Sequence, residues 1–173
     1  MKRVLSVIVA SVLSMFMATN VFAVQIVSNM KQLNAPSDAF VLERLGLVDT
    51  IFDKAAVTTA REEGTDLGKP GSFIGKIYFA DTSVDRSRLY LEGWEDVIEV
   101  GTDGGGCVEV YRTAADANRR SEYLGCFDGT ILDSGSHQVY GTCVIRTSSE
   151  LTLEQQTALT GKVVNALAVQ VIP

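Results

Sequence analysis

The sequence predicts an α+β domain with a mostly antiparallel sheet, helices packed on one face, and a ferredoxin-like, split β-α-β arrangement. Three observations indicate this fold. Residues 104–168 follow the pattern strand, helix, strand, helix, and a turn or capping residue marks each boundary. Residues 72–80 are typical of a further strand. The helices are too few and too short to cover both faces of a sheet easily, so we expect them on one side.

The first half of the chain predicts one helix followed by extended segments. Ser37 lies at the start of the helix, and Gly46 ends it. The residues predicted to point inward are Phe40, Val41 and Leu45. The segments predicted as extended are residues 25–28, the end of 47–59, 72–80 and 97–100, with loops at 61–71, 81–94 and 101–106.

The second half carries clearer boundary signals. A strand at residues 107–112 leads to Thr113, which caps a helix together with Asp116 at N3, and Gly125 supplies a left-handed residue that ends this helix. Residues 138–147 alternate in period two, which predicts one strand. Thr152 and Gln155 then cap the last helix.

Alternation assigns the strand residues to two faces, one of which meets the helices. The helix-facing set is Phe73, Ile77, Phe79, Val108, Val110, Val139, Cys143 and Ile145. The opposite set is Lys76, Tyr78, Glu109, Tyr111, Tyr140, Thr142 and Arg146.

The second set is the predicted binding site. Tyrosine offers a flat apolar ring with a polar tip, which suits sugars, peptides or protein surfaces. The alternative is that the N-terminal segment and residues 81–94 fold over this face and bury it as a second core.

Residues 1–23 have the features of a secretory signal peptide. Lys2 and Arg3 precede an apolar stretch, and Val21-Phe-Ala23 fits a cleavage site. The stretch is short for a membrane anchor, which needs about 20 apolar residues. We therefore expect residues 24–173 to form a single exported domain, secreted or extracytoplasmic at the cell surface or in the periplasm, with no membrane span after cleavage.

Charge restricts the partners of this domain. Loss of Lys2 and Arg3 lowers the basic residues from 15 to 13 against 21 acidic ones, so the net charge moves from −6 to −8. Such a surface repels nucleic acid and anionic membranes. We expect an extracellular or envelope partner and no cofactor.

Three cysteines follow the predicted cleavage site. An oxidising compartment permits one disulfide and leaves an odd thiol. Cys107 lies on a strand and Cys126 ends the helix that returns beside it, so this pair is the predicted disulfide. Cys143, in mid-strand, is predicted as a small buried apolar residue.

The chain resembles a family of exported bacterial surface and lipoprotein-type domains of unknown function, found in gut-associated Gram-positive and related bacteria. The matching segments are KPGSFIGKIYF, DTSVD, GTDGGGCVEVYRTAADANRRSEYLGCFDGT and SGSHQVYGTCVIRTSSELTLEQQ. The chain departs from the lipoprotein members in lacking a cysteine after the signal. The resemblance implies export and a shared fold, and it implies no activity.

His137 is the single histidine and the candidate base of a hydrolase. Ser134, Ser136 or Cys126 would attack, and Asp133 would orient the ring. The alternative is that these residues form an ordinary turn before a strand and have no catalytic role.

Metal and phosphate sites are weakly indicated. Asp81, Ser83, Asp85 and Glu92 have calcium-loop spacing, but Arg86 stands where that loop needs glycine. The glycines at 104–106 precede a strand, whereas a phosphate loop precedes a helix. We predict neither site.

The leading interpretation is a non-catalytic extracytoplasmic domain that binds an envelope or extracellular ligand or protein. The alternatives are a secreted hydrolase that uses His137 with a serine or cysteine nucleophile, and a structural accessory module of a surface complex.

Overall fold

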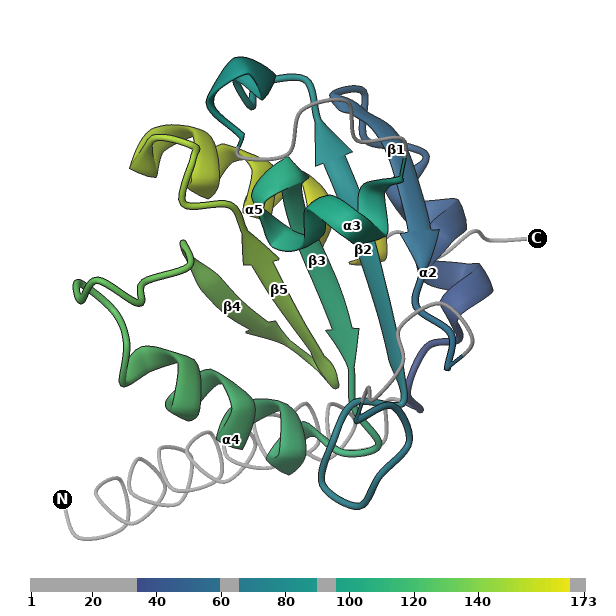
Figure 1. Cartoon of the computed structure of the whole chain (residues 1–173). Coiled ribbons are helices and arrows are strands. Elements are labelled where there is room, and N and C mark those ends of the chain that lie inside the picture. Colours follow the sequence, from purple (N-terminus) through teal and green to yellow (C-terminus); the bar gives the residue numbers. More distant parts are fainter. Residues whose placement is uncertain (1–33, 60–65, 90–95, 169–173) are drawn as a thin grey trace, which may run out of the picture. The chain divides into compact units, whose positions relative to one another are not determined.

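Five antiparallel strands form one sheet, and helices lie on both of its faces (Figure 1). The computed structural model describes residues 34–59, 66–89 and 96–168. The expected signal peptide, the predicted strand at 25–28 and Glu92 lie outside these residues. The strand order is β1 (Ile51–Ala56), β2 (Gly75–Asp81), β3 (Gly105–Val110), β5 (Cys143–Thr147) and β4 (His137–Tyr140). The predicted α+β class with an antiparallel sheet is confirmed.

The first face of the sheet carries the main apolar core. Helices α2 (Asp38–Leu45) and α5 (Leu153–Ala168) pack on this face. Its strand residues are largely those predicted to meet the helices, and they are buried with the apolar stripe of α5. The strand members of this cluster are Ile51, Ile77, Phe79, Val108, Val110, Cys143 and Ile145.

The second face also carries helices, so the prediction that all helices pack on one face is wrong. Helix α4 (Ala114–Gly125) packs on β4 and β5, and the short α3 (Val97–Val100) packs on β1 and β2. Ala117 and Leu124 of α4 are buried with Tyr111 and Val144, and Val139 packs against them. Phe73 and Val139, predicted for the first face, belong to this cluster.

A tight hairpin explains why Val139 was assigned to the wrong face of the sheet. The predicted single strand at 138–147 is two strands, because Tyr140 pairs with Cys143 and leaves Gly141 and Thr142 as a two-residue turn. Gly141 has φ +61°, and no non-glycine residue described has positive φ, which is the pattern of a type II′ turn. The hairpin reverses the chain, so Val139 lies opposite Val144 on the second face.

One split β-α-β unit is present. Strands β3 and β4 are both antiparallel to β5, which lies between them, so β3, α4 and β4 form a parallel crossover. The complete ferredoxin-like arrangement is not confirmed, since α4 and α5 lie on opposite faces and no strand follows α5 in the described part of the chain.

The predicted starts of two helices are confirmed, whereas the predicted end of α4 is wrong. Thr113 accepts a hydrogen bond from the Asp116 amide, and Thr152 exchanges bonds with Gln155, both as predicted. Gly125 is not left-handed, because α4 ends in a right-handed cap at Cys126 with φ −67°. The predicted strand at 97–100 is α3, whose first turn is capped by Asp96.

Glycines at the start of β3 permit close packing. Gly105 and Gly106 pair with Ala80 and Phe79 of β2, and Gly106 also pairs with Thr147 of β5. A Cβ on Gly106 would overlap the carbonyl oxygen of Arg146 and lie 2.6 Å from the Phe79 ring. These glycines therefore give Phe79 its place in the core.

Replacement of Gly106 by alanine should destabilise the fold by about 3 kcal/mol, since backbone and a core ring must move to admit the methyl group. The matched control is Gly161→Ala in α5, where a Cβ meets nothing within 4 Å, and it should stabilise by about 1 kcal/mol. Urea denaturation of both variants measures these changes. A neutral Gly106→Ala would contradict the packing described.

Candidate binding site around Glu109

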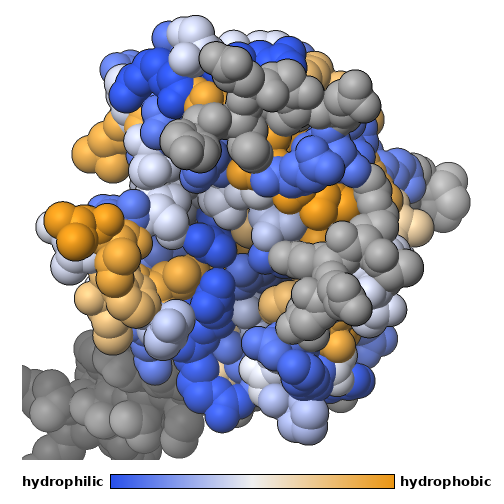
Figure 2. Space-filling view, in the orientation of Figure 1, coloured by the Kyte–Doolittle hydropathy of each residue, from blue (hydrophilic) through white to orange (hydrophobic). Residues whose placement is uncertain are grey.

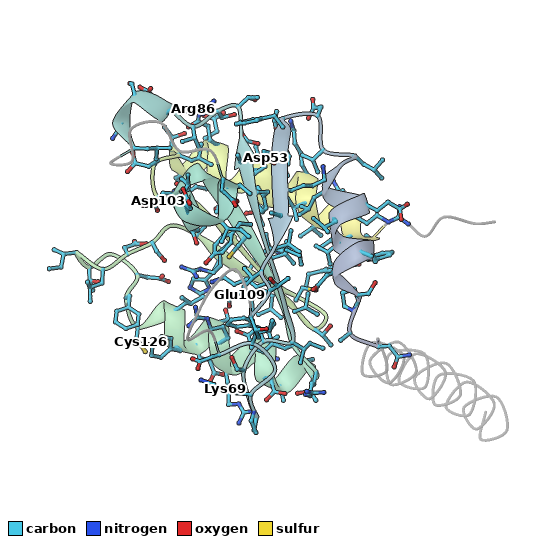
Figure 3. All side chains as sticks on the ribbon, turned by 45° about the vertical axis from the view of Figure 1, so that its right-hand side comes forward. Asp53, Lys69, Arg86, Asp103, Glu109 and Cys126 are labelled. Atoms are coloured by element: carbon cyan, nitrogen blue, oxygen red, sulfur yellow. The ribbon has the colours of Figure 1, made fainter. Side chains whose placement is uncertain are left out.

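Glu109 is a fully buried carboxylate at the centre of the second sheet face. Arg120 donates to both of its oxygens, from Nε at 2.9 Å and from Nη2 at 3.1 Å. Arg146 donates from Nη1 at 3.2 Å, and the hydroxyl of Tyr111 donates at 2.9 Å. Figure 3 shows Glu109 in the interior, beside α4. The carboxylate is thus held by two arginines and a phenol.

Three different elements bring the cations to Glu109. Lys76 of β2 is its direct cross-strand partner, and Arg146 projects from β5 on the other side. Arg120 reaches Glu109 from α4. The Lys76 ammonium also lies 4.4 Å from the centre of the Tyr78 ring, which is a cation–π contact. We call Glu109, Arg120, Arg146 and Lys76 the Glu109 cluster.

The charges set the ionisation of the cluster. Burial alone would raise the pKa of Glu109, but the hydrogen bond and charge of Arg120, with the charges of Arg146 and Lys76, hold that pKa below its usual value. Burial and the charge of Glu109 raise the pKa of Tyr111, so its hydroxyl stays a donor. The cluster contains three cations and one anion, so its net charge is positive.

The structure brings together most of the predicted binding residues but does not leave them open. Tyr78, Glu109 and Tyr111 are buried, and the side chain of Arg146 is only 12% exposed. This face is therefore buried, as in the alternative interpretation, but not by the described part of the segments that it named, of which the N-terminal segment and residues 90–94 lie outside the described residues. It is α3 and α4 that pack on the face.

Two predicted members lie elsewhere. Tyr140 packs against the main core on the first face, because the hairpin turn follows it. Thr142 lies in that turn and is buried.

Arg120 is a site residue that the sequence interpretation missed. Its signal is helical spacing, because Ala117, Arg120 and Leu124 fall at positions i, i+3 and i+7 on the stripe of α4 that meets the sheet. A cation on an inward stripe indicates a buried partner.

His137 contacts residues other than those predicted. Its Nδ1 lies 3.0 Å from the hydroxyl of Ser121 in α4, and its Nε2 lies 3.3 Å from a carboxylate oxygen of Asp128. The predicted groups have other partners: Ser134 accepts from Arg146, Ser136 donates to Gln156, Cys126 donates to the Glu122 carbonyl, and Asp133 accepts from Gly129 and Gly135.

The predicted disulfide between Cys107 and Cys126 is wrong. Cys107 is buried under α3, Cys126 is exposed at the end of α4, and all three cysteines are free. Helix α4 crosses to β4 and β5 and does not run back along β3, so its end lies away from Cys107. Cys143 is buried as predicted.

The described residues hold no group of three or more His, Cys, Asp or Glu side chains that could bind a metal ion. Asp81 and Asp85 accept from the amides of Ser83 and Ser87, so both stabilise local turns. Within the same ranges, no helix has the length and apolar character needed to cross a bilayer.

Comparisons with protein-family models, curated proteins and solved structures found no match. The resemblance to exported surface domains stays a prediction.

Glu109→Gln should lower the free energy of unfolding at pH 7 by about 3–5 kcal/mol, because two part-buried arginines lose their anion. The folded-state pKa of Glu109 lies below the ordinary 4.5, so its contribution is present above pH 4.5 and is lost as the pH falls below it. The difference in unfolding free energy between wild type and variant should therefore be smaller at pH 3 than at pH 7. Urea denaturation at both pH values, with Glu43→Gln as an exposed control, measures it. A gap that stays constant would contradict an ionised Glu109.

Only Cys126 should react promptly with a thiol reagent at pH 8. Burial, with the charge of Glu109, raises the pKa of Cys107 to about 11, and burial raises that of Cys143 to about 12, so both stay protonated and covered. Colorimetric titration should show one fast thiol in the folded chain, none in Cys126→Ser, and three after denaturation. Two fast thiols would contradict the burial of Cys107 or Cys143.

Proposed function

We propose that this chain is a non-catalytic exported domain that binds an anionic ligand of the envelope or extracellular medium at the Glu109 cluster. The observation that supports the proposal is the charge ratio: three cations surround one buried carboxylate in a chain of net charge −6. One cation would neutralise Glu109. The other two carry a desolvation cost that a bound anion would offset.

Donors are available for such a ligand. A guanidinium has five N–H groups, and the contacts described use Nε and Nη2 of Arg120 and both terminal nitrogens of Arg146. The side chain of Arg120 is 28% exposed, so one edge of the cluster reaches the surface. A carboxylate, sulfate or phosphate group accepts bonds from such donors.

The ligand would bind without being transformed. In the described part of the chain, the cluster contains no nucleophile beside a base, since Cys107 is a protonated thiol under α3 and Tyr111 is engaged with Glu109. We therefore propose that the Glu109 cluster recognises the charge of its ligand.

A hydrolase is the second candidate function, favoured by the contacts from Ser121 to His137 and from His137 to Asp128. It ranks second because Ser121 lies inside α4, where neighbouring amides already bond within the helix and cannot stabilise an oxyanion. Hydrolysis of p-nitrophenyl acetate that is lost in both Ser121→Ala and His137→Ala would favour the hydrolase.

Sodium phosphate, sulfate or acetate should raise the melting temperature of the wild type saturably, measured against sodium chloride at equal ionic strength. Lys76→Gln should weaken the response at least fivefold, because it removes a cation but none of the hydrogen bonds described for the Glu109 carboxylate. Lys162→Gln in α5 is the charge-matched control, since Lys162 pairs with Asp49 at the surface, and it should respond as the wild type does. Equal responses in all three proteins would mean that the cluster is structural only.

A further inference from the structure

A second surface, separate from the Glu109 cluster, has the character of a docking site. An open pocket of about 550 Å³ lies where β4 begins and α5 starts. Its lining includes the carboxylates of Asp128 and Asp133, the ring of His137 and the side chains of Gln156 and Leu153. We call it the acidic pocket.

Exposed apolar side chains lie beside the acidic pocket. Ile131 is 101% exposed and Leu132 65% exposed on the loop between α4 and β4, and Leu153 on the pocket wall is 75% exposed. Figure 2 shows hydrophobic residues gathered at the left edge, where Figure 1 draws this loop. Most apolar residues of this size are buried, so their grouping on one rim marks an interaction surface.

Hydrogen bonds brace the loop between α4 and β4. Its Asp133 carboxylate accepts from the amides of Gly129 and Gly135, the Thr130 hydroxyl donates to the Phe127 carbonyl, and Arg146 donates to Ser134. Ile131 and Leu132 are therefore held outward on a braced loop. A surface already ordered before binding loses less entropy when a partner docks.

The charge of the pocket selects the partner. Asp128 is exposed, and one of its carboxylate oxygens lies 3.3 Å from Nε2 of His137, a nitrogen that makes no hydrogen bond in the structure. The two carboxylates lie beside apolar side chains, which complements a cation next to apolar groups. A second copy of this chain, with net charge −6, fits this surface poorly.

We propose that the acidic pocket and the loop bearing Ile131 and Leu132 dock a peptide segment of a partner protein in which Lys or Arg adjoins large apolar residues. The cation lies against Asp128, and the apolar side chains cover Ile131, Leu132 and Leu153. This site consists of residues outside the Glu109 cluster, so either proposal can fail while the other holds.

The test is selection from a random heptapeptide phage library against the purified wild-type chain. Retained peptides should be enriched at least tenfold in Lys or Arg next to Leu, Ile, Phe or Trp. Asp128→Asn should remove the enrichment in cations, and the double variant Ile131→Ser, Leu132→Ser should remove that in apolar residues. Matched controls are Asp49→Asn and Leu47→Ser, both at exposed positions outside the pocket lining, which should keep the wild-type profile.

Three outcomes would overturn the proposal. The first is no enrichment, or the same enrichment in the site variants, all shown to be folded by circular dichroism. The second is self-association in sedimentation that the double variant abolishes, which would make the surface a contact between copies. The third is binding to phosphatidylcholine vesicles through Ile131 and Leu132 with no peptide selection.

Discussion

The buried carboxylate of Glu109 constrains the whole second face of the sheet. A charge with no access to water is stable only where partners surround it, and here Arg146 and Arg120 supply them. Arg120 reaches Glu109 only if α4 lies across β4 and β5, which is where the helix packs. The crossover from β3 through α4 to β4 is thus tied to one ionic contact as well as to apolar packing by Ala117 and Leu124.

The two faces of the sheet therefore have different chemistry. The first face is an apolar layer under α2 and α5, and its strand residues could be exchanged for others of similar volume. The second face carries cations and a carboxylate amid apolar clusters. Because apolar side chains of equal volume often stabilise as well as a buried ion network, stability alone does not account for the charges. That reasoning favours a ligand for the Glu109 cluster.

Helix caps and strand faces that depend on neighbouring residues could be predicted from the sequence. Thr113 and Thr152 cap helices because their side chains bond amides within the next turn, and strand alternation placed Ile77 and Val108 in the core. The hairpin at Gly141 was missed because alternation continues through it. Whether Tyr78 and Tyr111 are exposed or buried could not be decided from the sequence, because their burial depends on where α3 and α4 pack, which no local pattern contains.

Arg146 connects the two proposed surfaces. One terminal nitrogen of its guanidinium donates to Glu109 and the other donates to Ser134 in the loop that carries Ile131 and Leu132. His137 of the acidic pocket is also the cross-strand partner of Arg146. If a bound anion drew Arg146 away from Ser134, the loop would lose one of its hydrogen bonds, and linkage would then require a docked partner to change the affinity for that anion by the same factor. The two sites differ in chemistry, and Arg146 is a side chain that contacts residues of both.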